Sequence, residues 1–357
     1  MKYPYNQKEL DEATITEGRL GRTVKSYKYP CTPKEAYIAL YKGEPVWQVS
    51  GADEVRLFAP QIIPDNIARG MVIEGSDFPP PRDHEINTDI FGIEWEYIAS
   101  AFGSMVRPGK PTLSDANDWK SVIKFPDIEK WDWESAAKIS AEYLNTDKFT
   151  QMWFQTGWFE RLISWMDFES AAFALVDEEQ QDAVKEIMFA LSDLYIKIFD
   201  KCLKYFKIDG FCIHDDWGGQ KSCFFSPETG EEIIVPAMKK VTDFLHSKGV
   251  FCDLHSCGQA IRQVPNMIKA GWDSWSGQPM NDTQKEYELY GDKIIIGVIP
   301  DELAEDASES VVKAAAKNYV DKFCKIGKTS TLNPQAGGLG EVFRDEVYRL
   351  SRIAYNS

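Results

Sequence analysis

The chain of 357 residues is acidic, with 40 Lys and Arg against 56 Asp and Glu, a net charge of −16 and 43% apolar residues. This length and composition support one large domain or two ordinary ones with a full core, which excludes disorder for most of the chain. The negative charge disfavours nucleic acid and anionic membranes as partners. The sequence contains no run of 18 apolar residues, so it predicts no membrane span.

The seven cysteines lie at scattered positions. An odd, scattered set in a long chain is not typical of a disulfide framework, and the first 20 residues lack the apolar core of a signal peptide. The predicted location is therefore the cytoplasm.

Short apolar runs alternate with helical patterns along the chain. The first 50 residues predict an N-terminal helical extension, and residues 51–357 predict one barrel domain. Helices are expected at 178–206 and, led by a proline, at 236–248. Strands are expected at 55–59, 91–97, 151–155, 210–214, 250–254, 271–275, 293–298 and 329–333. Eight strands predict an α/β fold of the (β/α)8 TIM barrel type, because an open doubly wound sheet would carry a Gly-rich phosphate turn that this sequence lacks.

The first candidate site follows the strand expected at 210–214. His214, Asp215, Asp216 and Trp217 leave this strand together, where a barrel places its active site. Neighbours in an extended chain point to opposite sides, so one Asp would ligate or orient while the other caps a turn. We expect catalytic roles for Asp216 and Asp215 and substrate contacts from Trp217 and Gln220; the alternative is a polar turn with capping aspartates.

The second candidate site is the sequence His255-Ser256-Cys257-Gly258, directly after the strand expected at 250–254. His255 and Cys257 would lie on the same side of the chain, close enough to share one tetrahedral zinc ion. The alternative is a buried structural cysteine beside a hydrogen-bonded histidine.

Aromatic and polar side chains lie at or near other strand ends. A few indoles at the barrel mouth would form a flat apolar slot for an aromatic ring, although some must be core. The aromatic set is Trp153, Phe154, Trp158, Phe159, Trp165, Trp217, Trp272 and Trp275, and the polar set is Glu94, Glu96, Gln155, Asn333 and Gln335. Of these we expect Trp272, Glu94, Gln155 and Asn333 to bind substrate.

These motifs together resemble the uroporphyrinogen decarboxylase superfamily, and within it the branch of cobalamin-dependent methyltransferases. The resemblance is carried by DDWGGQ at 215–220, FFSPE at 224–228, LHSCG at 254–258 and GWDSW at 271–275. The fold of that superfamily is a distorted (β/α)8 barrel. The resemblance implies that His255 and Cys257 bind zinc together with a further Cys in a segment like LNPQAGG at 332–338. Ala336 stands near that place here, so either an oxygen ligand such as Asp216 or Glu94 completes the shell or the metal has been lost.

The activity implied by the resemblance is methyl transfer to cobalamin on a separate corrinoid protein. Zinc would act as a Lewis acid on the leaving atom, and a carboxylic acid such as Asp216 would supply a proton. The aromatic residues and the missing Cys favour a small, aromatic methyl ether as donor, in an O-demethylase. The alternatives are methyl transfer to a thiol, a binding module without activity, and uroporphyrinogen decarboxylation, for which residues 59–70 offer only Arg69 to hold a polycarboxylate. The sequence leaves open whether two copies of the chain form a homodimer.

Overall fold

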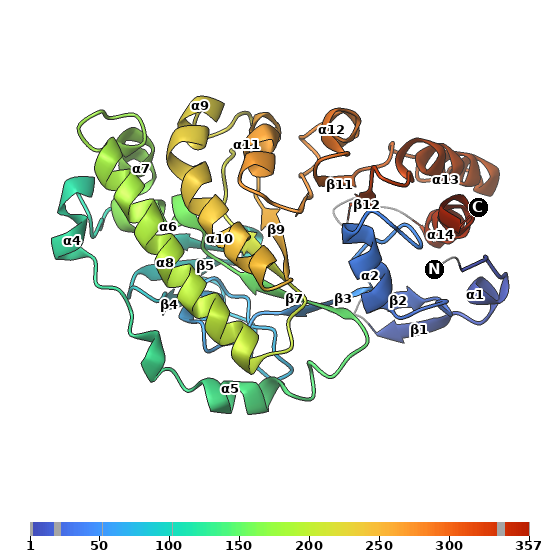
Figure 1. Cartoon of the computed structure of the whole chain (residues 1–357), viewed down its shortest axis with the longest axis horizontal. Helices are drawn as coiled ribbons and strands as arrows, with labels where there is room; N and C mark the ends of the chain where they lie inside the picture. The colour runs from blue at the N-terminus through green and yellow to red at the C-terminus, as the bar shows by residue number, and fades with distance from the viewer. Residues whose placement is uncertain (1–2, 18–22, 52, 102, 334–339, 357) are drawn as a thin grey trace. The chain divides into compact units, whose positions relative to one another are not determined.

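The computed structural model describes residues 3–17, 23–51, 53–101, 103–333 and 340–356. The chain forms two compact units (Figure 1). The larger unit comprises residues 57–145 and 150–272, and the smaller comprises 1–56, 146–149 and 273–357. All seven cysteines are free thiols, and no helix in the described ranges is long and apolar enough to cross a membrane.

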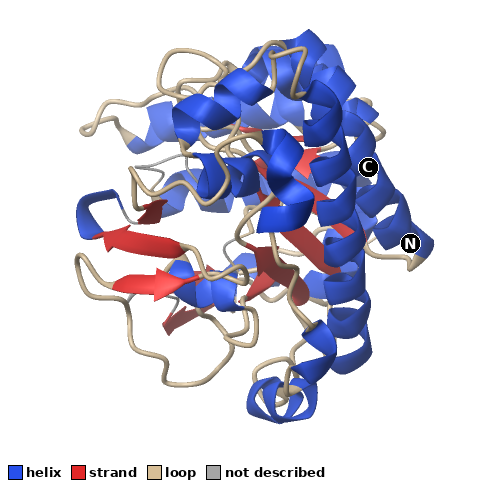
Figure 2. Cartoon of the chain, turned by 90° about the vertical axis from the view of Figure 1, so that its left-hand side faces the viewer, coloured by secondary structure: helices blue, strands red, loops and turns tan. Residues whose placement is uncertain are grey.

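The larger unit is built on parallel strands covered by helices. Strands β7 (Phe149–Phe154), β8 (Gly210–His214) and β9 (Phe251–His255) pair in parallel, and every residue of β8 is buried. A parallel strand with helices on its outer face is expected to be buried in this way. The long helix predicted at 178–206 is confirmed as α8 (Gln181–Tyr205), and the Pro-led helix is confirmed as α10 (Val235–Ser247). Helices α8 and α10 pack against each other over these strands (Figure 1). Figure 2 shows helices and strands in separate colours.

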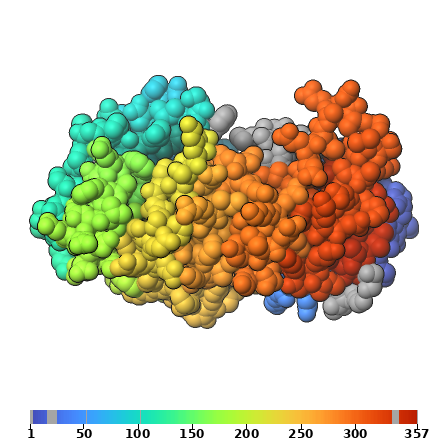
Figure 3. All heavy atoms as spheres, turned by 90° about the horizontal axis from the view of Figure 1, so that it is seen from above, coloured from blue at the N-terminus to red at the C-terminus, as the bar shows by residue number. Residues whose placement is uncertain are grey.

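Shorter helices complete the larger unit. Helix α6 (Trp158–Met166) follows β7 directly and leads into α7 (Phe168–Ala174). Figure 3 shows the surface of the larger unit, where the atoms around α7 are green and those around α9 are yellow. The remaining helices are α3 (Pro64–Ala68), α4 (Trp119–Val122), α5 (Trp133–Ser140), α9 (Pro227–Thr229) and α11 (Val264–Lys269).

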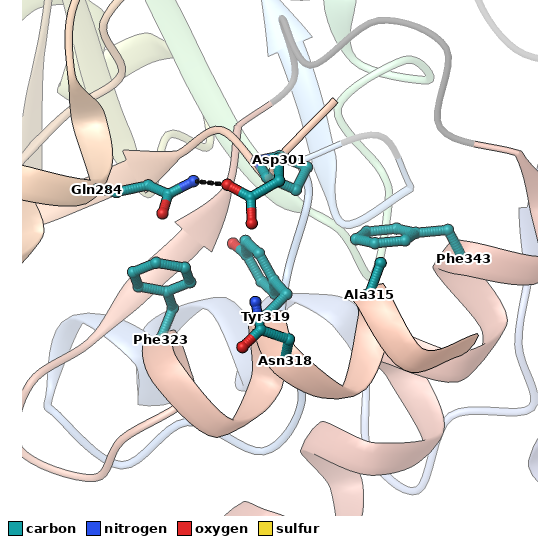
Figure 4. Close-up of a pocket in the computed structure, with 8 residues that line it drawn as sticks. Gln284, Asp301, Ala315, Asn318, Tyr319, Phe323 and Phe343 are labelled. Carbon is teal, nitrogen blue, oxygen red and sulfur yellow. Dashed lines mark hydrogen bonds between the residues drawn. The ribbon is translucent and has the colours of Figure 1, made fainter. Parts of the chain in front are cut away.

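The smaller unit holds three further parallel strands and both ends of the chain. Its strands are β10 (Ser274–Trp275), β11 (Ile295–Val298) and β12 (Ser330–Leu332), and its helices are α12 (Thr283–Tyr290), α13 (Glu309–Phe323) and α14 (Glu341–Asn356). Gln284 and Asp301 line a small pocket beside α13 and are joined by a hydrogen bond of 2.8 Å (Figure 4).

The N-terminal residues also belong to the smaller unit. This segment contains the helices α1 (Lys8–Asp11) and α2 (Pro33–Tyr41), and an antiparallel pair, β1 (Thr14–Glu17) and β2 (Thr23–Ser26), lies between them in the sequence. Arg352 of α14 forms a buried ion pair of 2.8 Å with Glu9, and Tyr348 donates to the same carboxylate. These contacts fix the first helix of the chain to the last.

The TIM-barrel-like α/β fold predicted from the sequence is confirmed, with one correction. Seven of the eight predicted strands are in the parallel sheet, in the order β9–β8–β7–β3 and β12–β11–β10, where β3 is Val55–Phe58. The run at 91–97 is instead β5 (Glu94–Ile98) in a separate antiparallel sheet with β4 (Ile86–Thr88) and β6 (Gly103–Val106).

The cause of this difference is a tight turn between β4 and β5. The carboxylate of Asp89 accepts hydrogen bonds from the backbone N–H groups of Phe91 and Ile93 and from the indole of Trp95, at 2.8–3.0 Å. Gly92 supplies a positive φ of 78°. An Asp that bonds the backbone ahead of it, followed by a glycine in the left-handed region, closes a hairpin, so this run pairs with its sequence neighbour.

Candidate functional site

Four possible metal ligands meet at the carboxyl ends of β8 and β9. His214 and His255 are the last residues of these strands and face each other in the register, with their rings stacked at a centroid distance of 4.9 Å. Asp216 and Cys257 each follow two residues later, on the same side of the chain. One ligand atom from each of the four residues lies within 4.8 Å of the others. The strand register therefore brings together both candidate sites of the sequence.

The distances within this cluster suit a tetrahedral metal ion. His255 Nε2 lies 3.3 Å from Cys257 Sγ, and His214 Nε2 lies 3.6 Å from Asp216 Oδ1. Zinc bonds of 2.0–2.3 Å to nitrogen, oxygen and sulfur place neighbouring ligand atoms roughly 3.3–3.6 Å apart. The Asp216 side chain is 28% exposed, so the cluster is open to solvent on that side. The donor set of two imidazoles, one carboxylate and one thiol thus fits zinc.

The four groups strongly affect one another's protonation. Burial would lower the pKa of His214, but Glu160 and Asp216 raise it well above its usual value. Burial and the charge of His214 lower the pKa of His255 to about 4. Burial opposes ionisation of Asp216, but the two histidines and the N–H of Cys257, which donates to Asp216 at 2.6 Å, lower its pKa overall. An anionic carboxylate therefore lies beside a neutral imidazole, as a cation site requires.

Asp215 has a different position from Asp216, as the alternation of an extended chain predicted. Its carboxylate accepts hydrogen bonds from the backbone N–H groups of Phe159 and Glu160 in the first turn of α6, and from the indole of Trp217 at 2.9 Å. Burial, with the nearby charge of Glu160, raises the pKa of Asp215 to about 7. Asp215 therefore caps α6 and is fully buried. Its predicted catalytic role stays a prediction.

The other predicted substrate residues lie outside the four-ligand cluster. Glu94 is on the antiparallel sheet, where its carboxylate accepts from Arg107 at 3.1 Å. Gln155 is buried with its amide 3.0 Å from the sulfur of Met71. Gln220 is exposed on the loop after β8. In the smaller unit, Asn333 donates to the carbonyls of Gly277 and Gly297, whereas Gln335 and Ala336 lie outside the described residues.

Seven of the eight aromatic residues named for the predicted slot are buried, and the slot itself stays a prediction. Trp272 is buried and packs edge-on against Trp158, with a distance of 6.4 Å between the ring centroids. The indole of Trp217 donates a hydrogen bond to Asp215. Trp153 is half-buried and lies 5.3 Å from the His255 ring. The other seven aromatic residues of the set are at most 2% exposed. Indoles at strand ends pack into the core here because helices cover the strands, so periodicity alone does not distinguish a slot from a core.

Three residues near the cluster were not predicted as part of a metal site. His214 was noted only for its place at a strand end, yet its Nε2 faces Asp216. Glu160 accepts from His214 Nδ1 at 2.6 Å, and Arg69 donates to Glu160 at 2.9 Å. The sequence offered a signal for His214, because His214 ends one predicted strand and His255 directly follows the next. Glu160 and Arg69 carried no such signal, because their distance from His214 in the sequence is large.

Gly258 allows the loops after β8 and β9 to pass close to each other. Its φ is +74°, and a Cβ atom there would lie 2.0 Å from the carbonyl oxygen of Gly218. The left-handed conformation alone costs a non-Gly residue roughly 1–2 kcal/mol. We expect Gly258→Ala to lower the free energy of unfolding by more than this amount and to weaken zinc binding.

Gly249 provides the matched control for this substitution. Its φ is +72°, and a Cβ atom there would meet nothing within 4 Å. Gly249→Ala should therefore show the backbone cost alone. Urea unfolding and zinc titration of both variants measure the difference, and equal losses would show that the close approach at Gly258 is unimportant.

A solved structure with a TM-score above 0.5 supports the TIM-barrel-like fold of this chain. A structure described as a methyltransferase from Methanosarcina mazei is 15% identical, with a TM-score of 0.54, and the match covers 92% of this chain and 100% of that one. A crystal structure of D-psicose 3-epimerase is 10% identical over 68% of this chain and 88% of that one, with a TM-score of 0.30. No curated protein matches the sequence. The family model of uroporphyrinogen decarboxylase (URO-D) matches residues 159–346, which include both strand ends of the metal cluster. The chain therefore belongs to the uroporphyrinogen decarboxylase family.

Proposed function

We propose that the protein is a zinc-assisted methyltransferase that moves a methyl group from a small methoxylated compound to cobalamin on a corrinoid protein. The observation that carries this proposal is the four-ligand cluster of His214, Asp216, His255 and Cys257 at the ends of β8 and β9. Zinc bound by these residues would be a Lewis acid that stabilises charge on the oxygen from which the methyl group departs.

The residues around the cluster support the removal of a methyl group from oxygen. The Asp216 side chain is 28% exposed, so as an anion it would hold zinc on a side of the cluster that a substrate oxygen can reach. The proton for the departing oxygen would come from solvent on that side. Cys257 is the only thiol in the cluster. One thiolate neutralises less of the zinc charge than several would, which favours activation of a weakly basic ether oxygen. The burial of the aromatic set removes the argument for an aromatic donor, so the proposal covers aliphatic and aromatic methoxy compounds alike.

Porphyrinogen decarboxylation, the activity in the name of the family, receives less support from this chain. Arg69 is the one arginine in its segment, its side chain is 10% exposed, and its guanidinium is paired with Glu160. A guanidinium already paired and largely buried is a poor anchor for the carboxylates of a porphyrinogen.

The proposed function is tested by spectroscopy with the zinc-loaded protein. It is mixed with a Co(I) corrinoid protein and a panel of aromatic and aliphatic methoxy compounds, and formation of methyl-Co(III) is followed by absorbance. We expect transfer from at least one donor, loss of transfer in chelator-treated protein, and slower transfer by Asp216→Ala. Turnover of uroporphyrinogen without transfer from any donor would overturn the proposal in favour of decarboxylation.

A further inference from the structure

His214 contacts a carboxylate on the side of its ring opposite the cluster. Nδ1 lies 2.6 Å from Oε2 of Glu160, while Nε2 faces Asp216. An ionised carboxylate only accepts hydrogen bonds, so a contact this short requires the hydrogen on Nδ1. Arg69 also approaches Nδ1, but its 3.5 Å distance is too long to compete. When His214 gives up its second proton to bind a metal, the lone pair is therefore on Nε2.

Both the side chain and the backbone of Glu160 form hydrogen bonds to other residues. Arg69 donates to its Oε1 at 2.9 Å, and the guanidinium of Arg69 lies over the ring of Trp95 at 4.5 Å. The backbone N–H of Glu160 donates to Asp215, the residue next to His214, at 2.9 Å. The carbonyl of His214 in turn accepts from Gly157, just before α6, at 2.7 Å. The end of β8 and the start of α6 are therefore joined by both side chains and backbone.

We infer that Glu160, fixed by Arg69, is a positioning residue that orients His214 so that Nε2 is directed at the metal. This inference rests on the proposed function, because it assumes that the cluster binds zinc. A carboxylate behind a metal-binding histidine fixes the ring and its tautomer and raises its basicity, and removing such a partner typically weakens metal binding about 10- to 100-fold.

The test compares zinc affinity in Glu160→Gln and Glu346→Gln by competition with a chromophoric chelator. Each substitution removes a carboxylate that pairs with an arginine, but Glu346 does not belong to the cluster and pairs with Arg349 at 2.6 Å. We expect Glu160→Gln to weaken zinc binding about 10- to 100-fold and to change the visible spectrum of the cobalt-substituted protein. Glu346→Gln should match the wild type in both measurements. Unchanged zinc affinity and cobalt spectrum in Glu160→Gln would overturn the inference and leave the proposed function standing.

A second measurement does not depend on the metal. The chain has only four histidines, so selective ¹⁵N labelling of histidine resolves the ring N–H protons of metal-free protein by NMR. We expect one downfield Nδ1–H resonance from His214 that is lost or shifted upfield in Glu160→Gln and unchanged in Glu346→Gln. If wild-type protein shows this resonance but binds no zinc, the proposed function fails and the positioning of His214 stands. If the wild type lacks the resonance, the positioning is wrong.

Discussion

His255→Ala and Cys257→Ala will each lower the affinity for zinc at least about 100-fold, more than the loss expected for a partner behind a ligand. Each substitution removes one donor from a set of four whose ligand atoms lie within 4.8 Å of one another. Protein purified without chelator and loaded with one equivalent of zinc should retain the metal in the wild type and release it in both variants. Elemental analysis after gel filtration and competition with a chelator measure the loss.

Cys223→Ala and His84→Ala are the controls for this result. Cys223 is half-buried and donates to the carbonyl of Gln259, and His84 is an exposed residue beside Glu96. Neither side chain belongs to the cluster, so both variants should bind zinc as the wild type does. If the two cluster variants retain as much zinc as these controls, His255 and Cys257 are not ligands and the motif is structural.

Replacing Arg161 by methionine will produce the largest loss of stability, about 3–5 kcal/mol of the free energy of unfolding. Arg161 is fully buried in α6 and forms ion pairs with Asp65 and Asp89, both buried. Methionine keeps much of the side-chain volume but leaves two carboxylates without a counter-charge. Urea unfolding of the metal-free variant measures the loss.

The stability loss in Arg161→Met should depend on pH. Burial already raises the pKa of Asp89 above its usual value although Arg161 opposes the shift. Without the arginine this pKa rises further, and a raised carboxyl pKa contributes stability at low pH that is lost as pH rises through the folded-state pKa. The deficit should therefore be larger at pH 8 than at pH 5. Arg107→Met, which breaks an exposed pair with Glu94, should cost at most about 1 kcal/mol. Equal, pH-independent losses in the two variants would show that the buried pairs do not determine the stability.

The parallel strands and the positions of three of the four candidate ligands at strand ends could be predicted from the sequence because their signals are local. A buried apolar run predicts a strand, and residues just after the run lie at the carboxyl end of the sheet, which locates His255, Cys257 and Asp216. The position of His214 opposite His255 depends on the register of β8 and β9. A predicted strand boundary that is uncertain by one residue does not determine this register.

The antiparallel sheet and the residues behind His214 could not be predicted in the same way. The run at 91–97 has strand composition in either sheet, and only the Asp89 turn decides its partner. Glu160 and Arg69 reach His214 through tertiary contacts between a helix, a loop and a strand. For the indoles, the same sequence pattern is compatible with a ligand slot and with a core, and the helices that cover them decide between the two.

The register of β8 and β9 makes the four candidate ligands one self-contained part of the fold. All four lie within residues 214–257, on two adjacent strands and the loops that leave them. Exchanging loops elsewhere in the chain would change the surroundings of these side chains without changing which residues meet there. A graft of these two strand ends onto a related barrel is therefore expected to carry the four side chains but not the loops that surround them.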